Sequence, residues 1–207
     1  MLWPVLFPST CPACNRAGPA PCPACLLAMR PPRPVPPPPA VDRWSALLAY
    51  DGPARELLAQ LKYRNRRSAV AWLAAGMAAL VACWVDTAAP DLVTWTPTSA
   101  ARVRGRGFDQ AELLARAVAR RLALPCSPFL VRLPGPPQTG RSRAERRYLP
   151  GFGLSPAGLA RCGGRAPPHV LLVDDVATTG ATLAAGARAL RAAGAGRVSA
   201  VVAGRRL

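Results

Sequence analysis

From Trp44 onward, apolar and polar positions follow two periods that alternate along the chain. Leucines recur at helical spacing on one face between Asp51, which can cap a helix, and Leu61. Short runs of β-prone residues occur instead at residues 92–96, 169–173 and 198–202. Strands that alternate with helical segments are typical of a parallel sheet with crossover helices. We therefore expect an α/β fold, built as a parallel sheet flanked by helices.

Three more segments predict helices. Asp109 and Glu112 form a start that resembles a capping box, and the apolar residues that follow share one side until Pro125 stops the helix. Residues 179–192 predict another helix. The uncharged run at residues 68–85 is long enough to span a membrane, but it is rich in alanine and therefore only weakly hydrophobic. We expect a buried helix there and no membrane span.

Two segments follow neither period. Residues 98–107 are rich in arginine and glycine and come directly after the run at residues 92–96, so we expect a loop there. Residues 132–150 contain many arginines without a sustained repeat, which predicts a mobile, basic loop. The chain shows no internal repeat.

Composition and charge narrow the class of partner without naming it. The chain has 207 residues, of which 51% are hydrophobic and 18% are charged, a balance typical of a folded protein with one main core. Its formal charge of +17 comes from 27 basic and 10 acidic residues, and Lys62 is its only lysine. Arginine binds phosphates as a planar fork, so this charge suits nucleic acid or phosphorylated small molecules. A GC-rich genome would enrich the same residues.

The amino-terminal part contains two Cys-Pro-Ala-Cys turns, formed by Cys11 with Cys14 and by Cys22 with Cys25. Four thiolates from two such turns complete the tetrahedral set that a structural zinc ion prefers. Two disulfides or a redox site are the alternatives. Residues 1–7 lack a basic region and are too short for the apolar part of a secretion signal. We therefore expect a cytoplasmic protein, in which zinc is favoured over disulfides.

Prolines separate the cysteine turns from the remainder of the chain. They dominate residues 30–39, which favour polyproline II and cannot enter a helix or a central strand. We interpret this segment as a stiff linker, and a ligand for an SH3-type domain is the alternative. The predicted organisation is a zinc module at residues 1–30, a linker at residues 31–43 and an α/β domain at residues 44–207.

The segment at residues 170–182 carries the clearest chemistry. Asp174 and Asp175 follow an apolar strand, where open α/β sheets bind ligands, and paired carboxylates there can accept hydrogen bonds from a ribose diol. Backbone N–H groups from Thr178 to Thr182 lie at a predicted helix N-terminus and form an anion site, to which threonine hydroxyls add donors. These groups together predict a ribose 5-phosphate ligand. The alternative is that the acids form an ordinary turn after a core strand.

The same segment resembles the phosphoribosyl pyrophosphate motif of type I phosphoribosyltransferases. Over nearly its whole length, the chain is also similar to the ComF family of competence-associated proteins, which have an amino-terminal four-cysteine module. Residues 106–115, RGFDQAELLA, are similar to an RGFNQAELLA-like segment of that family, and residues 138–147, QTGRSRAERR, to a QxxLSRAERRRN-like segment. Two positions differ from the family pattern: Asp109 stands where asparagine is usual, and Tyr148 stands where a polar residue is more typical.

The resemblance implies a type I phosphoribosyltransferase-like fold and roles for individual residues. It implies that Asp174, Asp175 and Arg143 are catalytic. The residues that would bind phosphoribosyl pyrophosphate are Val176, Ala177, Thr178, Thr179, Gly180, Ala181, Thr182, Pro97, Thr98, Arg102, Arg104, Gln138, Ser142 and Arg146. Arginines and magnesium suit the charge that builds on a departing pyrophosphate, and a loop that contains Arg143 would close over the site.

The resemblance leaves two functions open. In the first, the domain binds phosphoribosyl pyrophosphate with magnesium and transfers the phosphoribosyl group to a nitrogen nucleophile. In the second, the protein is a non-catalytic accessory of DNA uptake that binds single-stranded DNA or a competence helicase. Aromatic residues, on which single-stranded bases stack, make up only 6% of the chain, which favours the first function.

Overall fold

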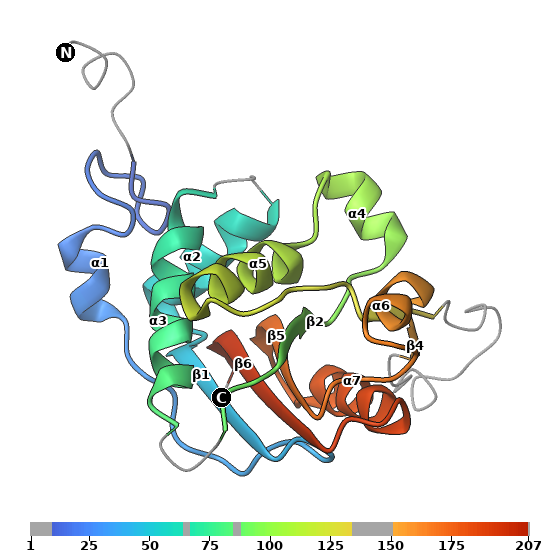
Figure 1. The fold of residues 1–207 in the computed structure, drawn as a ribbon. Helices are drawn as coiled ribbons and strands as arrows, with labels where there is room; N and C mark the ends of the chain where they lie inside the picture. Colours follow the sequence, from blue (N-terminus) through green and yellow to red (C-terminus); the bar gives the residue numbers. More distant parts are fainter. Residues whose placement is uncertain (1–9, 64–66, 85–87, 134–150, 207) are drawn as a thin grey trace, which may run out of the picture.

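The computed structural model describes residues 10–63, 67–84, 88–133 and 151–206, and Figure 1 shows their arrangement. The helices are α1 (Pro23–Ala28), α2 (Gly52–Tyr63), the 3-10 helix η2 (Arg67–Ala69), α3 (Val70–Ala82), α4 (Ala100–Arg106), α5 (Gln110–Leu122), α6 (Pro156–Arg161) and α7 (Ala181–Ala192). The strands are β1 (Arg43–Ala49), β2 (Leu92–Trp95), β3 (Leu130–Arg132), β4 (Phe152–Leu154), β5 (His169–Ala177) and β6 (Arg197–Arg205).

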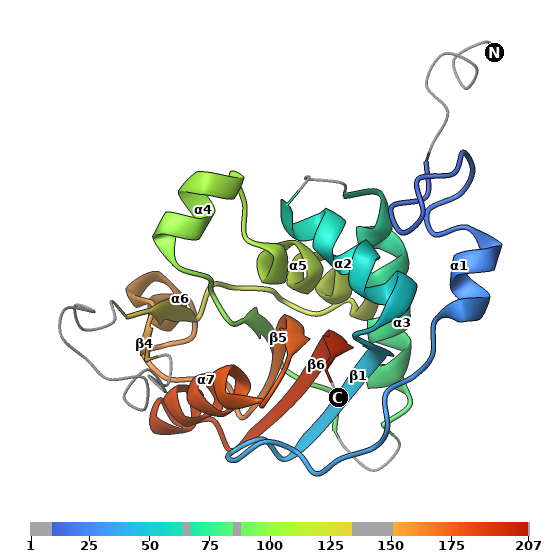
Figure 2. The ribbon, with the colours of Figure 1, turned by 180° about the vertical axis from the view of Figure 1, so that it is seen from behind.

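The described residues form a parallel sheet with the strand order β1, β6, β5, β2. Strand β5 pairs with β6 from His169 opposite Arg197 to Ala177 opposite Arg205. Helices α2, α3 and α5 cover one face of the sheet, and α7 covers the other (Figures 1 and 2). A parallel sheet is normally buried on both faces, so the predicted α/β fold with flanking helices is confirmed.

Each face of the sheet has its own hydrophobic core. On the first face, the predicted leucines Leu57, Leu58 and Leu61 of α2 are completely buried and pack with α3 and α5. On the second face, residues of α7 such as Leu183 and Leu190 pack against β5 and β6. Most of the uncharged run forms helix α3, which buries one face, with Leu73, Met77 and Val81, and exposes residues such as Ala71 and Ala79. None of the helices in the described ranges combines the length and apolarity that crossing a bilayer requires.

Two boundaries differ from the sequence-based expectation. The segment at residues 98–107 was expected to be a loop, but most of it forms α4, because Ser99 caps its first turn and Gly107 ends it at a φ of 79°. Strand β5 does not stop before the acid pair but extends to Ala177, because pairing with β6 continues beyond Asp174. Both carboxylates therefore project from the carboxyl-terminal part of a strand rather than from a turn.

The sequence patterns did not predict several short elements. The antiparallel pair of β3 and β4 packs on α7, helix α6 follows β4, and β1 forms one edge of the main sheet. Strands of three residues are too short to show a period, and α6 depends on the cap that Ser155 provides to Gly158 N. The predicted loop at residues 132–150 lies mostly outside the described residues.

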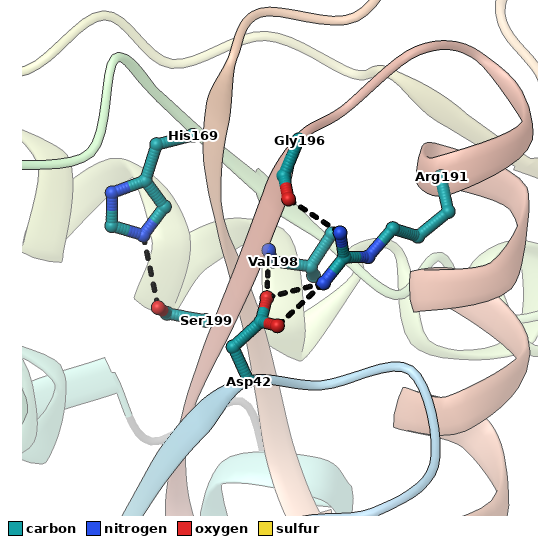
Figure 3. Close-up of polar contacts among 6 residues, drawn as sticks. All are labelled: Asp42, His169, Arg191, Gly196, Val198 and Ser199. Carbon is teal, nitrogen blue, oxygen red and sulfur yellow. Dashed lines mark hydrogen bonds and ion pairs between the residues drawn. The ribbon is translucent and has the colours of Figure 1, made fainter.

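Polar side chains connect separate elements at the amino ends of the strands (Figure 3). Arg191 of α7 donates from Nη2 to the two carboxylate oxygens of Asp42 at 2.6 and 2.5 Å, and Val198 N donates to Asp42 Oδ2 at 2.7 Å. The distance between His169 Nε2 and Ser199 Oγ is 2.9 Å. The Asp42 contacts attach the residue before β1 to α7 and β6, and the His169 contact joins β5 to β6.

Candidate functional site

A polar cavity of about 310 Å³ lies beside the carboxyl-terminal parts of β2 and β5. We call it the central pocket. Its walls come from the segment after β2, from α4 and the start of α5, from β3 and from the end of β5 with the start of α7. The lining residues are Thr96, Pro97, Thr98, Arg102, Arg106, Asp109, Gln110, Ala111, Arg132, Asp174, Asp175, Val176 and Thr182.

The two acids of β5 stand on one side of the central pocket. Asp174 is only 8% exposed, and its Oδ1 accepts a hydrogen bond from Asp175 N at 2.8 Å. The carboxylate of Asp175 in turn accepts from Val176 N at 2.5 Å. Carboxylates held in this way provide oxygen acceptors for hydroxyl groups or for a hard cation.

Arginines from α4 and β3 also line the pocket. Arg102 and Arg106 come from α4, and Arg106 Nη1 donates to Gln110 Oε1 at 3.0 Å. Arg132 comes from β3, where burial first and the positive charge of Arg102 second lower the pKa of its guanidinium, although Asp174 opposes this effect. The central pocket therefore has both carboxylates and guanidinium groups in its lining, a combination suited to a ligand that carries both hydroxyls and phosphates.

Asp109 is a third acid in the lining of the pocket. Its carboxylate accepts from Thr98 N at 2.7 Å and from Ala111 N at 2.9 Å, so it caps α5 and also holds the segment after β2. Burial raises the pKa of Asp109 and the charge of Asp175 raises it further, whereas the bonds from Thr98, Ala111 and Glu112 lower it. The N–H groups of Thr98 and Ala111 therefore already donate hydrogen bonds within the protein.

The loop at residues 176–182, which we call the motif loop, contributes to two cavities. Val176 and Thr182 line the central pocket, whereas Thr178, Thr179 and Gly180 line a second cavity beneath the proline segment. Gly180 has a φ of 75° and stands at the N-cap of α7, where no side chain caps the helix. Ala181 N donates to Thr179 Oγ1 at 3.3 Å.

The structure brings some of the sequence-predicted site residues together and leaves others apart. Pro97, Thr98 and Arg102 share the central pocket with both acids. Arg104 is exposed on α4 and does not line this pocket, and Ala177 and Ala181 do not line it either. Gln138, Ser142, Arg143 and Arg146 lie outside the described residues.

Sequence reasoning missed two arginines and an amide in this pocket. Arg106 and Gln110 belong to the RGFDQ segment, so the motif itself was a signal for them. Arg132 had no such signal, because β3 and β4 are too short to be recognised from their pattern. Gln110 is 2% exposed, and its Nε2 has no hydrogen-bond partner in the described structure.

The four amino-terminal cysteines lie together as the two-turn pattern predicted. The Sγ atoms of Cys11, Cys14, Cys22 and Cys25 all lie within 4.8 Å of one another, and all four are free thiols. Burial raises the pKa of Cys11, but hydrogen bonds led by that from Cys22 N outweigh burial and lower this pKa to about 6. Burial raises the pKa of Cys25. Four thiols at these separations are placed to bind one metal ion, and a structural zinc ion fits this donor set.

The fold and the central pocket define an α/β protein with a polar cavity beside the carboxyl ends of parallel strands, the place where open α/β sheets generally bind ligands. No family model and no curated protein matches the chain. Among solved structures, the chain is similar to the crystal structure of adenine phosphoribosyltransferase from Leishmania tarentolae, with 14% sequence identity over 70% of this chain and 74% of that chain, and a TM-score of 0.42.

Proposed function

We propose that the α/β domain at residues 44–207 binds phosphoribosyl pyrophosphate with magnesium in the central pocket, and that it is a type I phosphoribosyltransferase-like domain of a ComF-like protein. The observation that carries this proposal is the convergence of the Asp174 and Asp175 carboxylates with Arg102, Arg106 and Arg132 around one cavity. Hydroxyls of a ribose suit the two acids, and phosphates suit the arginines.

Each part of the proposed ligand has matching groups in the protein. The ribose diol would donate hydrogen bonds to Asp174 and Asp175. The 5-phosphate would lie at the motif loop of residues 176–182, of which Val176 and Thr182 already line the pocket. The pyrophosphate would face the arginines of α4 and β3. Gln138, Ser142, Arg143 and Arg146 are assigned to the same ligand by the family resemblance.

In the proposed reaction, a nitrogen lone pair attacks the anomeric carbon of the ribose. The bond from that carbon to the pyrophosphate oxygen breaks, pyrophosphate leaves with the bonding electrons, and the nitrogen releases its proton to solvent. Arg102, Arg106 and Arg132 would stabilise the charge on the leaving oxygen. When bound, magnesium supplies further charge neutralisation, and the carboxylate oxygens of Asp174 and Asp175 are the hard donors that fit it.

Thermal stabilisation by phosphoribosyl pyrophosphate with magnesium tests the binding proposal. The wild-type chain should be stabilised at saturating ligand, and the double variant D174N/D175N should lose this stabilisation. Glu56→Gln, which removes an exposed acid of α2, is the matched control and should keep it. Release of pyrophosphate with a panel of bases and amines then tests transfer. Absence of any stabilisation of the wild-type chain would overturn the proposal.

The cysteine module has a proposal of its own, that it holds one structural zinc ion. The supporting observation is the grouping of four thiols within 4.8 Å, three of them on buried residues. Metal analysis of the purified protein should find about one zinc per chain, bound by the four thiolates that a closed site requires. Cys25→Ser should lower the zinc content, whereas Cys83→Ser, which changes an exposed thiol elsewhere, should not. An unchanged zinc content in Cys25→Ser would contradict the assignment.

A second candidate function, accessory binding of single-stranded DNA or of a competence helicase, is favoured by one observation. Helix α4 has no buried residue and exposes Arg102 and Arg104 beside the central pocket. Oligonucleotide affinity that falls steeply with salt would support this function, because phosphate contacts release counterions. The double variant D174N/D175N should leave such binding unchanged, whereas R102Q/R104Q should weaken it.

A further inference from the structure

The proline segment, residues 30–39, runs along the surface of the molecule from α1 to β1 (Figure 2). Up to Pro38 it contains neither helix nor strand nor turn. Proline restricts φ and favours polyproline II, a helix with three residues per turn. Every third side chain of such a helix lies on the same edge, so a burial pattern that repeats every three residues is expected where one edge touches the protein.

The burial of the proline segment has this period of three. Pro32 is half-buried and Pro38 is buried. Val35 lies between them, and although it is 44% exposed, its carbonyl oxygen accepts a hydrogen bond from Trp44 Nε1 at 3.1 Å. We call these three residues the inward edge. The remaining residues of the segment are all exposed: Arg30, Pro31, Arg33, Pro34, Pro36, Pro37 and Pro39.

The exposed residues form two outward edges, one with residues 31, 34 and 37 and the other with residues 33, 36 and 39. Apart from the arginines, every outward position is a proline. A linker that only spans the distance between α1 and β1 does not need an apolar residue at each position that faces solvent. A continuous exposed apolar surface is instead typical of a site that binds another protein.

Contacts at both ends hold the proline segment in place. Arg30 O accepts a hydrogen bond from Ala49 N at 2.9 Å, and the Arg30 guanidinium lies 2.6 Å from the Asp51 carboxylate. At the other end, Pro38 packs closely on Gly180, since a Cβ atom at Gly180 would lie 2.7 Å from Pro38 Cγ. A segment that is already fixed in an extended form loses little conformational entropy when a partner binds it.

Positive charge accompanies the outward edges. Arg33 is exposed and makes no ion pair with any described residue. No acidic residue occurs between Arg30 and Val41. The partner surface should therefore be acidic, because complementary charge favours the encounter of two proteins. The formal charge of +17 disfavours a second copy of this chain as the partner.

We propose that the proline segment is a docking site for a different protein, which contains a small domain with an aromatic groove for polyproline II and acidic residues beside that groove. Domains of this kind bind proline-rich segments that are already extended. The prolines of the two outward edges would pack on the aromatic side chains, and Arg33 would pair with an acid. The inward edge would remain on β1 and the motif loop, so the partner would bind without displacing the segment.

Calorimetric titration of the full chain with isolated SH3 and WW domains tests the proposal. The domains are chosen to have acidic residues beside the aromatic groove. At least one of them should bind saturably, with a Kd in the micromolar range that is usual for small, transient interfaces. No saturable binding of the full chain to any of these domains would overturn the proposal.

Matched substitutions on the two kinds of edge make the test specific. Pro34→Ala removes an outward proline and should weaken binding about tenfold, a typical loss for a contact that binding buries. Pro32→Ala makes the same change on the inward edge and should weaken binding less than about twofold. Both variants lose the same local stiffness. Equal losses in the two variants would show that the outward edges are not recognised, and would also overturn the proposal.

The charge requirement has its own pair of variants. Arg33→Gln should weaken binding about threefold and reduce its dependence on salt, as an exposed charge at an interface does. Arg188→Gln, which removes an exposed arginine of α7, is the matched control and should bind as the wild type does. All of these changes are at surface positions, and thermal unfolding checks that each variant is folded.

A free peptide of residues 30–40 provides the last comparison. All three edges are accessible in the peptide, but it is not held at its ends. A domain that recognises the outward edges should therefore bind the full chain more tightly than the peptide. A domain that binds the peptide but not the full chain requires the inward edge, and this result for every domain would count against the docking site.

Discussion

The sheet uses its polar residues differently at its two ends. At the amino ends of the strands, polar groups have partners on other elements: the exposed Asp42 binds Arg191 and Val198 N, and the buried His169 binds Ser199 (Figure 3). At the carboxyl ends, polar groups surround two cavities, and two buried donors, Gln110 Nε2 and Arg205 Nε, have no partner in the described structure. Completed pairs at one end serve folding, whereas incomplete donors at the other end leave capacity for ligands.

The first prediction concerns the amino ends of the strands, where the polar groups have partners. It has the largest expected effect on stability. Asp42→Ala removes the acceptor of Val198 N and the partner of Arg191, so the free energy of unfolding should fall by about 2 kcal/mol. Chemical denaturation measures this loss. Asp42→Asn, which keeps an acceptor oxygen for Val198 N, should lose less than Asp42→Ala. Both variants should keep the stabilisation by phosphoribosyl pyrophosphate, and its loss would show that the two ends are not separate.

The second prediction concerns the carboxyl ends of the strands, where Gln110 lies. Gln110→Met keeps the side-chain volume but removes an amide whose Nε2 has no partner in the described structure. The free energy of unfolding should change by less than about 0.5 kcal/mol, because no buried partner of Nε2 is left unpaired. Binding of phosphoribosyl pyrophosphate should weaken about tenfold, the loss expected for one hydrogen bond to a charged ligand.

Stability and affinity measured on the same variant make this prediction specific. A stability loss of more than about 1 kcal/mol with unchanged affinity would assign Gln110 to the fold, through its bond from Arg106. Arg106→Gln provides the comparison, since it removes that bond and a charge of the central pocket together. It should weaken ligand binding at least as much as Gln110→Met.

The sequence predicted those parts of the molecule in which a local pattern has a local cause. The leucines of α2 recur with the helical period because that face is buried, and Asp109 could be recognised as a cap because the capping bonds lie within three residues. The four cysteines could be recognised from their spacing alone. The acid pair was recognised for the same reason, although its exact position on β5 was not.

The parts that could not be predicted depend on contacts between distant segments. Helix α4 has no buried residue and therefore no apolar period, so its arginines suggested a loop. Arg132 reaches the central pocket only because β3 pairs with β4. The proline segment gave no sign of its contact with Gly180, because polyproline II has the same local pattern whether it is free or packed. The second cavity, which lies beneath the proline segment and depends on that contact, was not visible in the sequence.

The last prediction returns to the amino ends and has the smallest expected effect. His169 is buried at the start of β5, where Nδ1 faces Ala88 O at 3.0 Å and therefore carries the proton of the neutral ring. Burial first, with help from the charge of Arg197, lowers the pKa of His169, although the Ala88 carbonyl and Asp91 oppose this shift. The unfolded chain then takes up a proton on His169 at a higher pH than the folded chain does.

The sign of the pH dependence follows from this difference. The stability that depends on neutral His169 should be complete above the ordinary histidine pKa of about 6.5 and should be lost as the pH falls below it, by up to about 1 kcal/mol near pH 5. Chemical denaturation between pH 5 and pH 7.5 measures this loss. His169→Gln should have a shallower pH dependence than the wild type, whereas Arg188→Gln, an exposed change on α7, should keep the wild-type slope. Equal slopes in the wild type and His169→Gln would mean that groups other than His169 govern the acid sensitivity.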